Sequence, residues 1–394
     1  MCSNGHSQCL KSPAFGALFF RPAIFRRKVI ELKKMFSVYL VLIFLLVGCS
    51  SNNQQDAVHN NNEQKTPQSQ QENPELEVIA KNLDVPWSIE KINNTFYLTE
   101  RTGSIVKIEN GEMMRQSVKL DKKKATASEA GLLGFVLAPD FQESNLAYAY
   151  YTYEDSSGQF NRIITLQLED NVWREKSLLL DKIPSGSYHH GGRLKIGSDG
   201  KLYATAGDAS ESDIAQDLDS LGGKILRMNF DGSVPNDNPF SDSYIFSYGH
   251  RNPQGMTWMP DGTLYASEHG NSANDEINRI EAGQNYGWPI IEGYKEQKGM
   301  VSPLFTSGDE STWAPSGMAN YNGKLYVAAL RGTAVLEFDL ETGEYREVIT
   351  GPGRIRDILI EDHILYFISN NLDGRGNPED NDDRLYRISL SESN

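Results

Sequence analysis

A tyrosine between two apolar residues recurs six times along the chain, usually just after a turn. The copies are Phe96-Tyr97-Leu98, Ala147-Tyr148-Ala149, Leu202-Tyr203-Ala204, Leu264-Tyr265-Ala266, Leu325-Tyr326-Val327 and Leu365-Tyr366-Phe367. Successive tyrosines are 51, 55, 62, 61 and 40 residues apart, about the length of a four-stranded β-propeller blade with variable loops. The repeat therefore predicts one structural unit for each copy.

Each copy is followed by a second alternating strand that ends at a turn. One example is Lys224-Ile225-Leu226-Arg227-Met228, which precedes Asp231-Gly232. We interpret the two segments as adjacent strands of one blade, because helical periodicity is weak almost everywhere. Residues 76–394 are thus predicted to form an all-β fold, a six-bladed β-propeller of four-stranded antiparallel blades. An array of β-sandwiches is the alternative.

Residues 1–48 are predicted to be a signal segment rather than part of this fold. Basic residues precede a run from Phe36 to Val47 that is apolar except for Ser37, which is too short to span a bilayer but typical of a signal-peptide core. The run ends at Gly48-Cys49, which resembles a bacterial lipobox in which Cys49 is lipidated. A soluble protein with an apolar N-terminal helix is the alternative. Residues 1 to about 28 do not resemble a signal peptide and suggest a start codon assigned too far upstream.

The segment 49–75 is predicted to be the lipidated cysteine and a flexible tether. From Ser50 to Asn73 the chain is mostly Gln, Asn and Ser, with too few apolar side chains to order itself. We therefore expect a protein held at the cell membrane by lipid, on the extracytoplasmic face.

Charge and cysteine content restrict the partners. Without residues 1–48, which hold seven basic and one acidic residue, 31 basic and 52 acidic residues remain, a net charge of −21. This balance disfavours nucleic acid as a partner and suits divalent cations. All three cysteines lie at or before Cys49, so no disulfide is expected in the folded domain.

Two adjacent histidines precede a glycine pair in Tyr188-His189-His190-Gly191-Gly192. An acid/base group beside glycines lies where the backbone can approach a ligand closely, as in a catalytic loop. A satisfied structural histidine pair is the alternative for this motif taken alone.

Further loop motifs are spaced at blade intervals. They are Glu129-Ala130-Gly131-Leu132-Leu133-Gly134, Asp237-Asn238-Pro239-Phe240, Gly249-His250-Arg251-Asn252-Pro253-Gln254-Gly255, Ser267-Glu268-His269-Gly270 with Asp275-Glu276-Ile277-Asn278, Asn285-Tyr286-Gly287-Trp288-Pro289 and Gly353-Arg354-Ile355-Arg356-Asp357. With the His189 loop, and in unbroken order from about Val78 to Leu390, they resemble the soluble sugar dehydrogenases that depend on pyrroloquinoline quinone (PQQ). That family includes soluble glucose dehydrogenase and the aldose sugar dehydrogenases.

The resemblance implies a catalytic base and a cofactor site. His189 matches the family's general base, and His190 falls at a position that varies. PQQ carries three carboxylates, which arginine binds well because its planar guanidinium engages a carboxylate with two hydrogen bonds. The residues implied to contact PQQ are Glu129, Arg251, Asn252, Tyr294, Ala329, Leu330, Arg331, Arg354, Ile355 and Arg356. Taken alone, Arg354 and Arg356 could also be exposed charges on a strand.

The resemblance also implies two Ca²⁺ sites. The backbone carbonyls of Gly270 and Asn271 match the protein ligands of the Ca²⁺ that PQQ chelates. Glu276 and Tyr286 match a second, structural Ca²⁺ site of the aldose dehydrogenases. An ion-paired loop carboxylate is the alternative for Glu276.

Two positions depart from the family. Glu129 stands where Gln is usual beside the quinone, and a carboxylate there would repel an anionic cofactor unless it were protonated or paired. Arg331 stands where Lys is usual. We expect a Glu129–Arg331 ion pair to compensate both changes.

The predicted function is a membrane-anchored, extracellular dehydrogenase that needs PQQ and Ca²⁺ and oxidises the C1 hydroxyl of an aldose to a lactone. A non-catalytic propeller that binds a ligand is the alternative. A zinc hydrolase using His189, His190, His250 and His269 is a third reading, although no two of these histidines have H-x-x-x-H spacing. Neither the sugar, the electron acceptor nor the oligomeric state can be read from these motifs.

Overall fold

The computed structural model describes residues 75–390, and almost all of the regular structure in that range is β-strand. The strands form four four-stranded sheets and one eight-stranded sheet. The predictions for residues 1–74, which cover the signal segment, Cys49 and nearly all of the tether, lie outside the described residues.

The eight-stranded sheet consists of two antiparallel groups of four. The first group contains β2 (Pro86–Ile92), β3 (Thr95–Glu100), β4 (Ser104–Glu109) and β5 (Glu112–Lys119). The second contains β6 (Leu132–Leu137), β7 (Leu146–Asp155), β8 (Gly158–Glu169) and β9 (Val172–Pro184), with the short helix α2 (Phe141–Ser144) after β6. A parallel pairing of β5 with β9, in which Ser117 lies opposite Val172, joins the groups.

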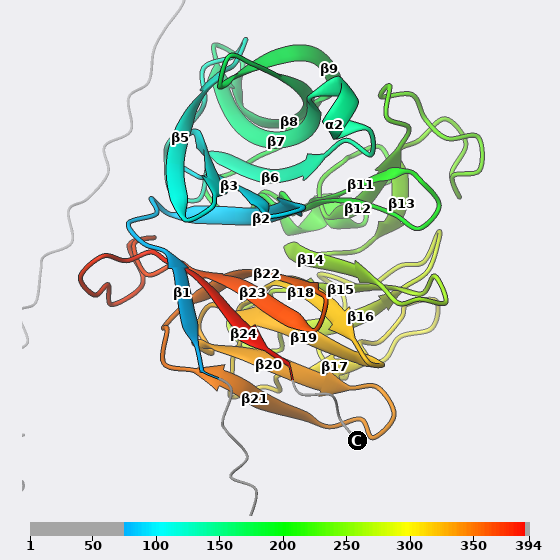
Figure 1. Cartoon of the computed structure of the whole chain (residues 1–394). Helices are drawn as coiled ribbons and strands as arrows, with labels where there is room; N and C mark the ends of the chain where they lie inside the picture. Colours follow the sequence, from blue (N-terminus) through cyan, green and yellow to red (C-terminus); the bar gives the residue numbers. More distant parts are fainter. Residues whose placement is uncertain (1–74, 391–394) are drawn as a thin grey trace, which may run out of the picture. The chain divides into compact units, whose positions relative to one another are not determined.

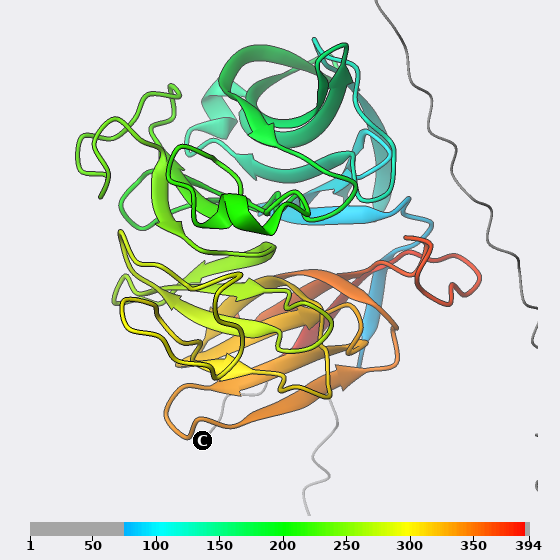
Figure 2. The same ribbon diagram turned by 180° about the vertical axis from the view of Figure 1, so that it is seen from behind.

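Three further sheets follow in chain order, each with its strands in sequence order. The first contains β10 (Leu194–Ile196), β11 (Leu202–Ala206), β12 (Lys224–Met228) and β13 (Ile245–Tyr248), with a 3₁₀ helix at Ser212–Ala215. The second contains β14 (Pro253–Trp258), β15 (Leu264–Glu268), β16 (Glu276–Ile280) and β17 (Phe305–Thr306). The third contains β18 (Pro315–Tyr321), β19 (Lys324–Ala329), β20 (Ala334–Asp339) and β21 (Tyr345–Thr350). The long connections after β12 and β16 extend beyond the strands in the reverse view (Figure 2).

The last sheet joins the two ends of the described chain. It contains β22 (Ile355–Glu361), β23 (Ile364–Ser369), β24 (Leu385–Ser389) and β1 (Glu77–Ala80). β1 is antiparallel to β24, with Glu77 opposite Arg387, and Figure 1 shows the blue strand beside the red one.

Each repeated tyrosine lies in the second strand of a four-stranded group. The six strands are β3, β7, β11, β15, β19 and β23, and the six side chains are all at most 8% exposed. Burying such a ring stabilises the fold by about 1.5–3 kcal/mol. Tyr97, for example, packs edge-on against Phe141 and Trp173 of the neighbouring group. The prediction of an all-β fold of four-stranded antiparallel units is confirmed.

Short hairpins set the register of many strands. Asn110-Gly111 between β4 and β5, and Asn322-Gly323 between β18 and β19, have positive φ at both positions. Two such residues form the type I′ turn that matches the twist of paired strands, and Asn and Gly tolerate this backbone region best.

The first strands of the groups lie next to one another at the centre. β2 contacts β6 and β22, β6 contacts β10, and β18 contacts β14 and β22. Asp357 of β22 accepts hydrogen bonds from the backbone of Ile89 in β2 and from the Arg193 side chain just before β10, at 2.9 and 2.8 Å. Because strands alternate in direction, the loops before each first strand and after each second strand meet at one edge of the sheets.

Candidate functional site

The loops at this edge surround a cavity of about 270 Å³. Its lining residues come from loops next to almost all of the strand groups and are Glu129, Tyr188, His189, Arg251, Asn252, His269, Gly270, Asn271, Ser272, Asp275, Thr312, Ala314, Arg331 and Arg375. Seven of the predicted site positions, spread over 202 residues of sequence, share this cavity: Glu129, His189, Arg251, Asn252, Gly270, Asn271 and Arg331.

His189 is held at its ring and at its backbone. The ring Nδ1 lies 2.7 Å from Asp208 Oδ1, and the backbone N–H donates to Glu129 Oε2 at 3.2 Å. The residue has φ 64°, a left-handed conformation that costs a non-glycine residue about 1–2 kcal/mol. Since Nδ1 faces the carboxylate, Nε2 is the nitrogen left for a ligand.

Asp208 fixes the orientation of the His189 ring. Its carboxylate is almost fully buried, and its second oxygen accepts a hydrogen bond from the Trp288 indole at 2.9 Å. A carboxylate on Nδ1 selects the tautomer with a proton there and a lone pair on Nε2. Asp208 was assigned no role from the sequence, although a Gly-Asp pair directly after a strand, here Gly207-Asp208 after β11, could have indicated this partner.

His190 faces the interior instead of the cavity. Its Nδ1 lies 3.0 Å from Ser185 Oγ, and burial lowers its pKa to about 4. The imidazole is therefore neutral at physiological pH.

Arg251 and His269 leave buried nitrogen atoms without partners at the cavity. Arg251 Nε and His269 Nε2 have no hydrogen bond within residues 75–390. The Arg251 guanidinium lies 5.3 Å from the centre of the Trp288 ring, and burial lowers the pKa of His269 to about 4. Buried polar atoms normally have a partner, so unpartnered ones at a cavity are typical of a ligand site.

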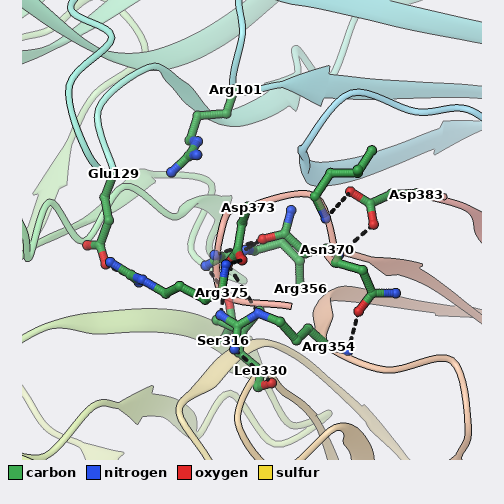
Figure 3. Close-up of polar contacts among 12 residues, drawn as sticks. Arg101, Glu129, Ser316, Leu330, Arg354, Arg356, Asn370, Asp373, Arg375 and Asp383 are labelled. Atoms are coloured by element: carbon green, nitrogen blue, oxygen red, sulfur yellow. Dashed lines mark hydrogen bonds and ion pairs between the residues drawn. The ribbon is translucent and has the colours of Figure 1, made fainter. Parts of the chain in front are cut away.

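Arg354 and Arg356 are buried behind the cavity rather than exposed on a strand. Arg354 donates to Asp373 Oδ2 at 2.8 and 3.2 Å and to the Leu330 carbonyl at 3.1 Å. Arg356 donates to Gln254 Oε1 at 2.8 Å and to Asn370, and burial lowers its pKa to about 9. Figure 3 shows both guanidinium groups near Asp373.

The prediction of an ion pair between Glu129 and Arg331 was wrong. Arg375, from the loop between β23 and β24, donates to Glu129 Oε1 at 2.6 Å, and Figure 3 shows this contact. Arg331 is exposed and makes no side-chain hydrogen bond or ion pair within the described part of the chain. Burial alone would raise the pKa of Glu129, but the charge and hydrogen bond of Arg375 outweigh it and lower the pKa to about 2.

The other predicted cofactor residues differ in position. Asn252 lines the cavity, and its Oδ1 accepts a hydrogen bond from the Gly191 backbone at 3.0 Å. Ala329, Leu330 and Ile355 are buried in or beside the inner strands. Tyr294 is 69% exposed and lies outside the cavity lining, so the structure does not bring it together with the other residues.

The predicted metal residues belong to two adjoining places. Gly270 and Asn271 line the main cavity, and their N–H groups donate to Asp275 and Glu292. Glu276 and Tyr286 border a smaller cavity of about 10 Å³, about the space of one water molecule, together with Glu268 and Glu292.

Glu276 is a buried carboxylate that has no cationic hydrogen-bond partner among residues 75–390. It accepts hydrogen bonds from the Gly293 backbone at 2.9 Å and from Asn278 at 3.1 Å. Burial and the neighbouring Glu268 and Glu292 raise its pKa to about 8. Within residues 75–390 no three His, Cys, Asp or Glu side chains are arranged to hold a metal, so backbone carbonyls would have to complete a site.

The glucose/sorbosone dehydrogenase family model matches residues 83–386. The chain belongs to this family. The resemblance predicted from the loop motifs is therefore confirmed.

Individual family members match over different lengths. Aldose sugar dehydrogenase YliI of Escherichia coli is 32% identical over 76% of this chain and 91% of its own length. Quinoprotein glucose dehydrogenase B of Acinetobacter calcoaceticus is 34% identical over 58% of this chain, and the match spans only 55% of that relative. The PQQ-bound structure of aldose sugar dehydrogenase from Streptomyces coelicolor superposes with a TM-score of 0.75 at 31% identity, over 80% of this chain and 98% of that one.

No helix among the described residues has the length and apolar character needed to cross a membrane.

Proposed function

We propose that this chain is an aldose dehydrogenase that uses PQQ and Ca²⁺ to oxidise the C1 hydroxyl of a sugar to a lactone. The observation that carries the proposal is the cavity itself, where a histidine oriented by a buried carboxylate lies beside Arg251 and His269, each with a buried nitrogen that has no hydrogen-bond partner within residues 75–390. Membership of the glucose/sorbosone dehydrogenase family and the PQQ-bound state of the Streptomyces coelicolor relative support the same assignment.

The cavity suits an anion with several carboxylates. Arg251 and Arg331 line it, and Arg251 Nε and His269 Nε2 are buried without partners within residues 75–390. Glu129 does not oppose this charge, because Arg375 neutralises it. Arg251, Asn252 and Arg331 would hold the cofactor, and the buried Arg356 would add positive charge, whereas Asp373 balances the charge of Arg354.

His189 would act as the general base. With Nδ1 bound to Asp208, Nε2 can accept the proton of the C1 hydroxyl, and Asp208 then stabilises the imidazolium that forms. Bound PQQ would supply a quinone, which can accept the hydride from the same carbon. Loss of one proton and one hydride from C1–OH gives the lactone.

Ca²⁺ fits the small cavity and its neighbourhood. The acceptors are oxygen atoms, which Ca²⁺ prefers, and a cation would stabilise the ionised form of Glu276 against Glu268 and Glu292. Carbonyl oxygens of Gly270 and Asn271 would serve the ion that accompanies the cofactor.

We also infer six blades, with the eight-stranded sheet counted as two blades joined at β5 and β9. The six tyrosine-bearing second strands and the contacts between the first strands support this count. Attachment to the membrane through lipidated Cys49, on the extracytoplasmic face, rests on the sequence pattern alone. We further propose that the electrons pass to an external acceptor.

An absorbance titration tests the function. We expect the purified protein to bind PQQ in the presence of Ca²⁺, and an added aldose to reduce the bound quinone. A matched Glu281→Gln variant, changed at an exposed residue, controls for handling. Binding without reduction by any aldose would support the non-catalytic alternative, and no binding would refute the proposal.

A further inference from the structure

Glu129 and Arg375 link a loop of the last sheet to the backbone of the predicted base. Glu129 precedes β6 and Arg375 lies between β23 and β24, 246 residues later. The contact therefore joins two loops that are far apart in sequence.

The two oxygens of Glu129 have different partners. Oε1 accepts the Arg375 guanidinium at 2.6 Å, and Oε2 accepts the backbone N–H of His189 at 3.2 Å. A hydrogen bond to a charged acceptor is about twice as strong as one between neutral groups, so the pair holds this N–H more firmly than a neutral amide would.

Arg375 has a second contact on the same peptide. Its guanidinium lies 5.6 Å from the centre of the Tyr188 ring, and Tyr188 directly precedes His189. Arg375 thus contacts Tyr188 directly and the His189 N–H through Glu129. The opposite side of His189 is also confined, because a Cβ on Gly207 would meet the His189 carbonyl oxygen at 2.0 Å.

The sequence Asp373-Gly374-Arg375-Gly376 builds the turn that presents this arginine. Asp373 Oδ1 accepts the Arg375 backbone N–H at 2.9 Å, while its other oxygen binds Arg354. Gly374 has φ 86°, and a Cβ on Gly376 would lie 2.6 Å from the Asn371 backbone. The position of Arg375 is therefore specified by the fold of its own loop.

We infer that Arg375 and Glu129 form a positioning pair for His189, which holds the left-handed His189 backbone so that the imidazole meets both Asp208 and the substrate. This inference rests on the proposed function for the role of His189. The inference also explains why this chain has glutamate at a position where glutamine is usual. A carboxylate accepts hydrogen bonds from Arg375 and from the His189 N–H at once, and it forms an ion pair with Arg375 that has no net charge.

Kinetic measurements on variants test the pair. Arg375→Gln should lower kcat about 10- to 100-fold with a change in KM of less than about twofold, the size of effect that a small misplacement of a catalytic group produces. Arg375→Lys should recover most of the loss. In a double-mutant cycle, Glu129→Gln with Arg375→Gln should lose no more than the worse single variant, because the two changes remove one interaction.

A second readout does not require the cofactor. In protein labelled with ¹⁵N at histidine, the His189 ring resonances, assigned with His189→Gln, should move or broaden in Arg375→Gln and return in Arg375→Lys. The matched control is the Arg387–Glu77 pair, also an arginine–glutamate contact of 2.7 Å but between β24 and β1. Arg387→Gln should leave both the kinetics and the His189 resonances unchanged.

The outcomes are distinct. Unchanged His189 resonances and kcat in Arg375→Gln would overturn the inference, as would a loss that Arg375→Lys fails to recover. If Arg375→Gln does not fold, Arg375→Lys and Glu129→Gln carry the same comparison. If the parent binds no PQQ but the ring resonances still respond to Arg375→Gln, the proposed function fails while the positioning pair stands.

Discussion

Replacing Glu276 by glutamine should have opposite effects on stability with and without Ca²⁺. In the metal-free protein the carboxylate is buried, and burial with the nearby Glu268 and Glu292 raises its pKa from 4.5 to about 8. Between these values the folded state keeps a proton that the unfolded chain releases. The free energy of unfolding therefore falls as the pH rises from about 4.5 to 8.

The size of the effect follows from this difference. A pH of 7 is about 2.5 units above the pKa of Glu276 in the unfolded chain. At 1.36 kcal/mol per unit, this difference corresponds to about 3 kcal/mol of lost stability. Glutamine avoids this loss but keeps only one acceptor oxygen, and the lost hydrogen bond to Gly293 or Asn278 costs about 1 kcal/mol. The metal-free variant should thus be more stable than the parent by about 2 kcal/mol.

Calcium should reverse the order. At a thousandfold above its dissociation constant, a bound ion stabilises the parent by about 4 kcal/mol, and the neutral amide should lose most of this gain. Urea unfolding at pH 7, in chelator and in Ca²⁺, measures both differences. In chelator, the parent should also lose stability between pH 5 and 8 with a slope that the variant lacks.

Two results would refute this reasoning. One is equal stability of parent and variant in chelator, and the other is an equal response of both proteins to Ca²⁺. Glu281→Gln is the matched control, since its carboxylate lies just beyond the same strand but is 59% exposed. It should follow the parent under every condition.

Two other substitutions test the site and the anchor. His189→Gln should keep PQQ binding but lower turnover about 10²–10⁴-fold. His190→Gln should mainly lower the melting temperature, because the His190 ring is buried against Ser185 and Asn161. Equal losses of turnover in the two variants would mean that the wrong imidazole is assigned. Cys49→Ser should move the protein from the detergent phase to the aqueous phase in a phase-partition assay, because lipidation is the proposed attachment, and retention in the detergent phase would contradict the lipid anchor.

Local pattern predicted the strands better than their long-range partners. The repeated tyrosines marked the second strand of every group because a buried ring between apolar neighbours is a local signal. The parallel pairing of β5 with β9 and the pairing of β1 with β24 depend on contacts between distant segments. No turn or period in the sequence records either one.

The site shows the same limit. Motif position gathered His189, Arg251 and Asn252 correctly at one cavity, since loops at the ends of inner strands must meet there. Motif position also predicted an ion pair between Glu129 and Arg331. Arg331 does line the cavity, but its side chain forms no ion pair in the described structure. The actual partner, Arg375, contacts Glu129 because the turn Asp373-Gly374-Arg375-Gly376 presents its side chain there. The sequence of this segment predicts a tight turn, but it does not predict the direction in which the arginine points.

The pairing of β1 with β24 has a consequence for synthesis. Glu77 leaves the ribosome early, yet Arg387, its partner across the sheet, follows 310 residues later. Until then β1 has no neighbour, and β23 presents an open edge that could pair with another chain. A chain that stops short of Leu385 would therefore keep both edges exposed permanently, and loss of the last ten residues should cause aggregation as readily as a defect in the core.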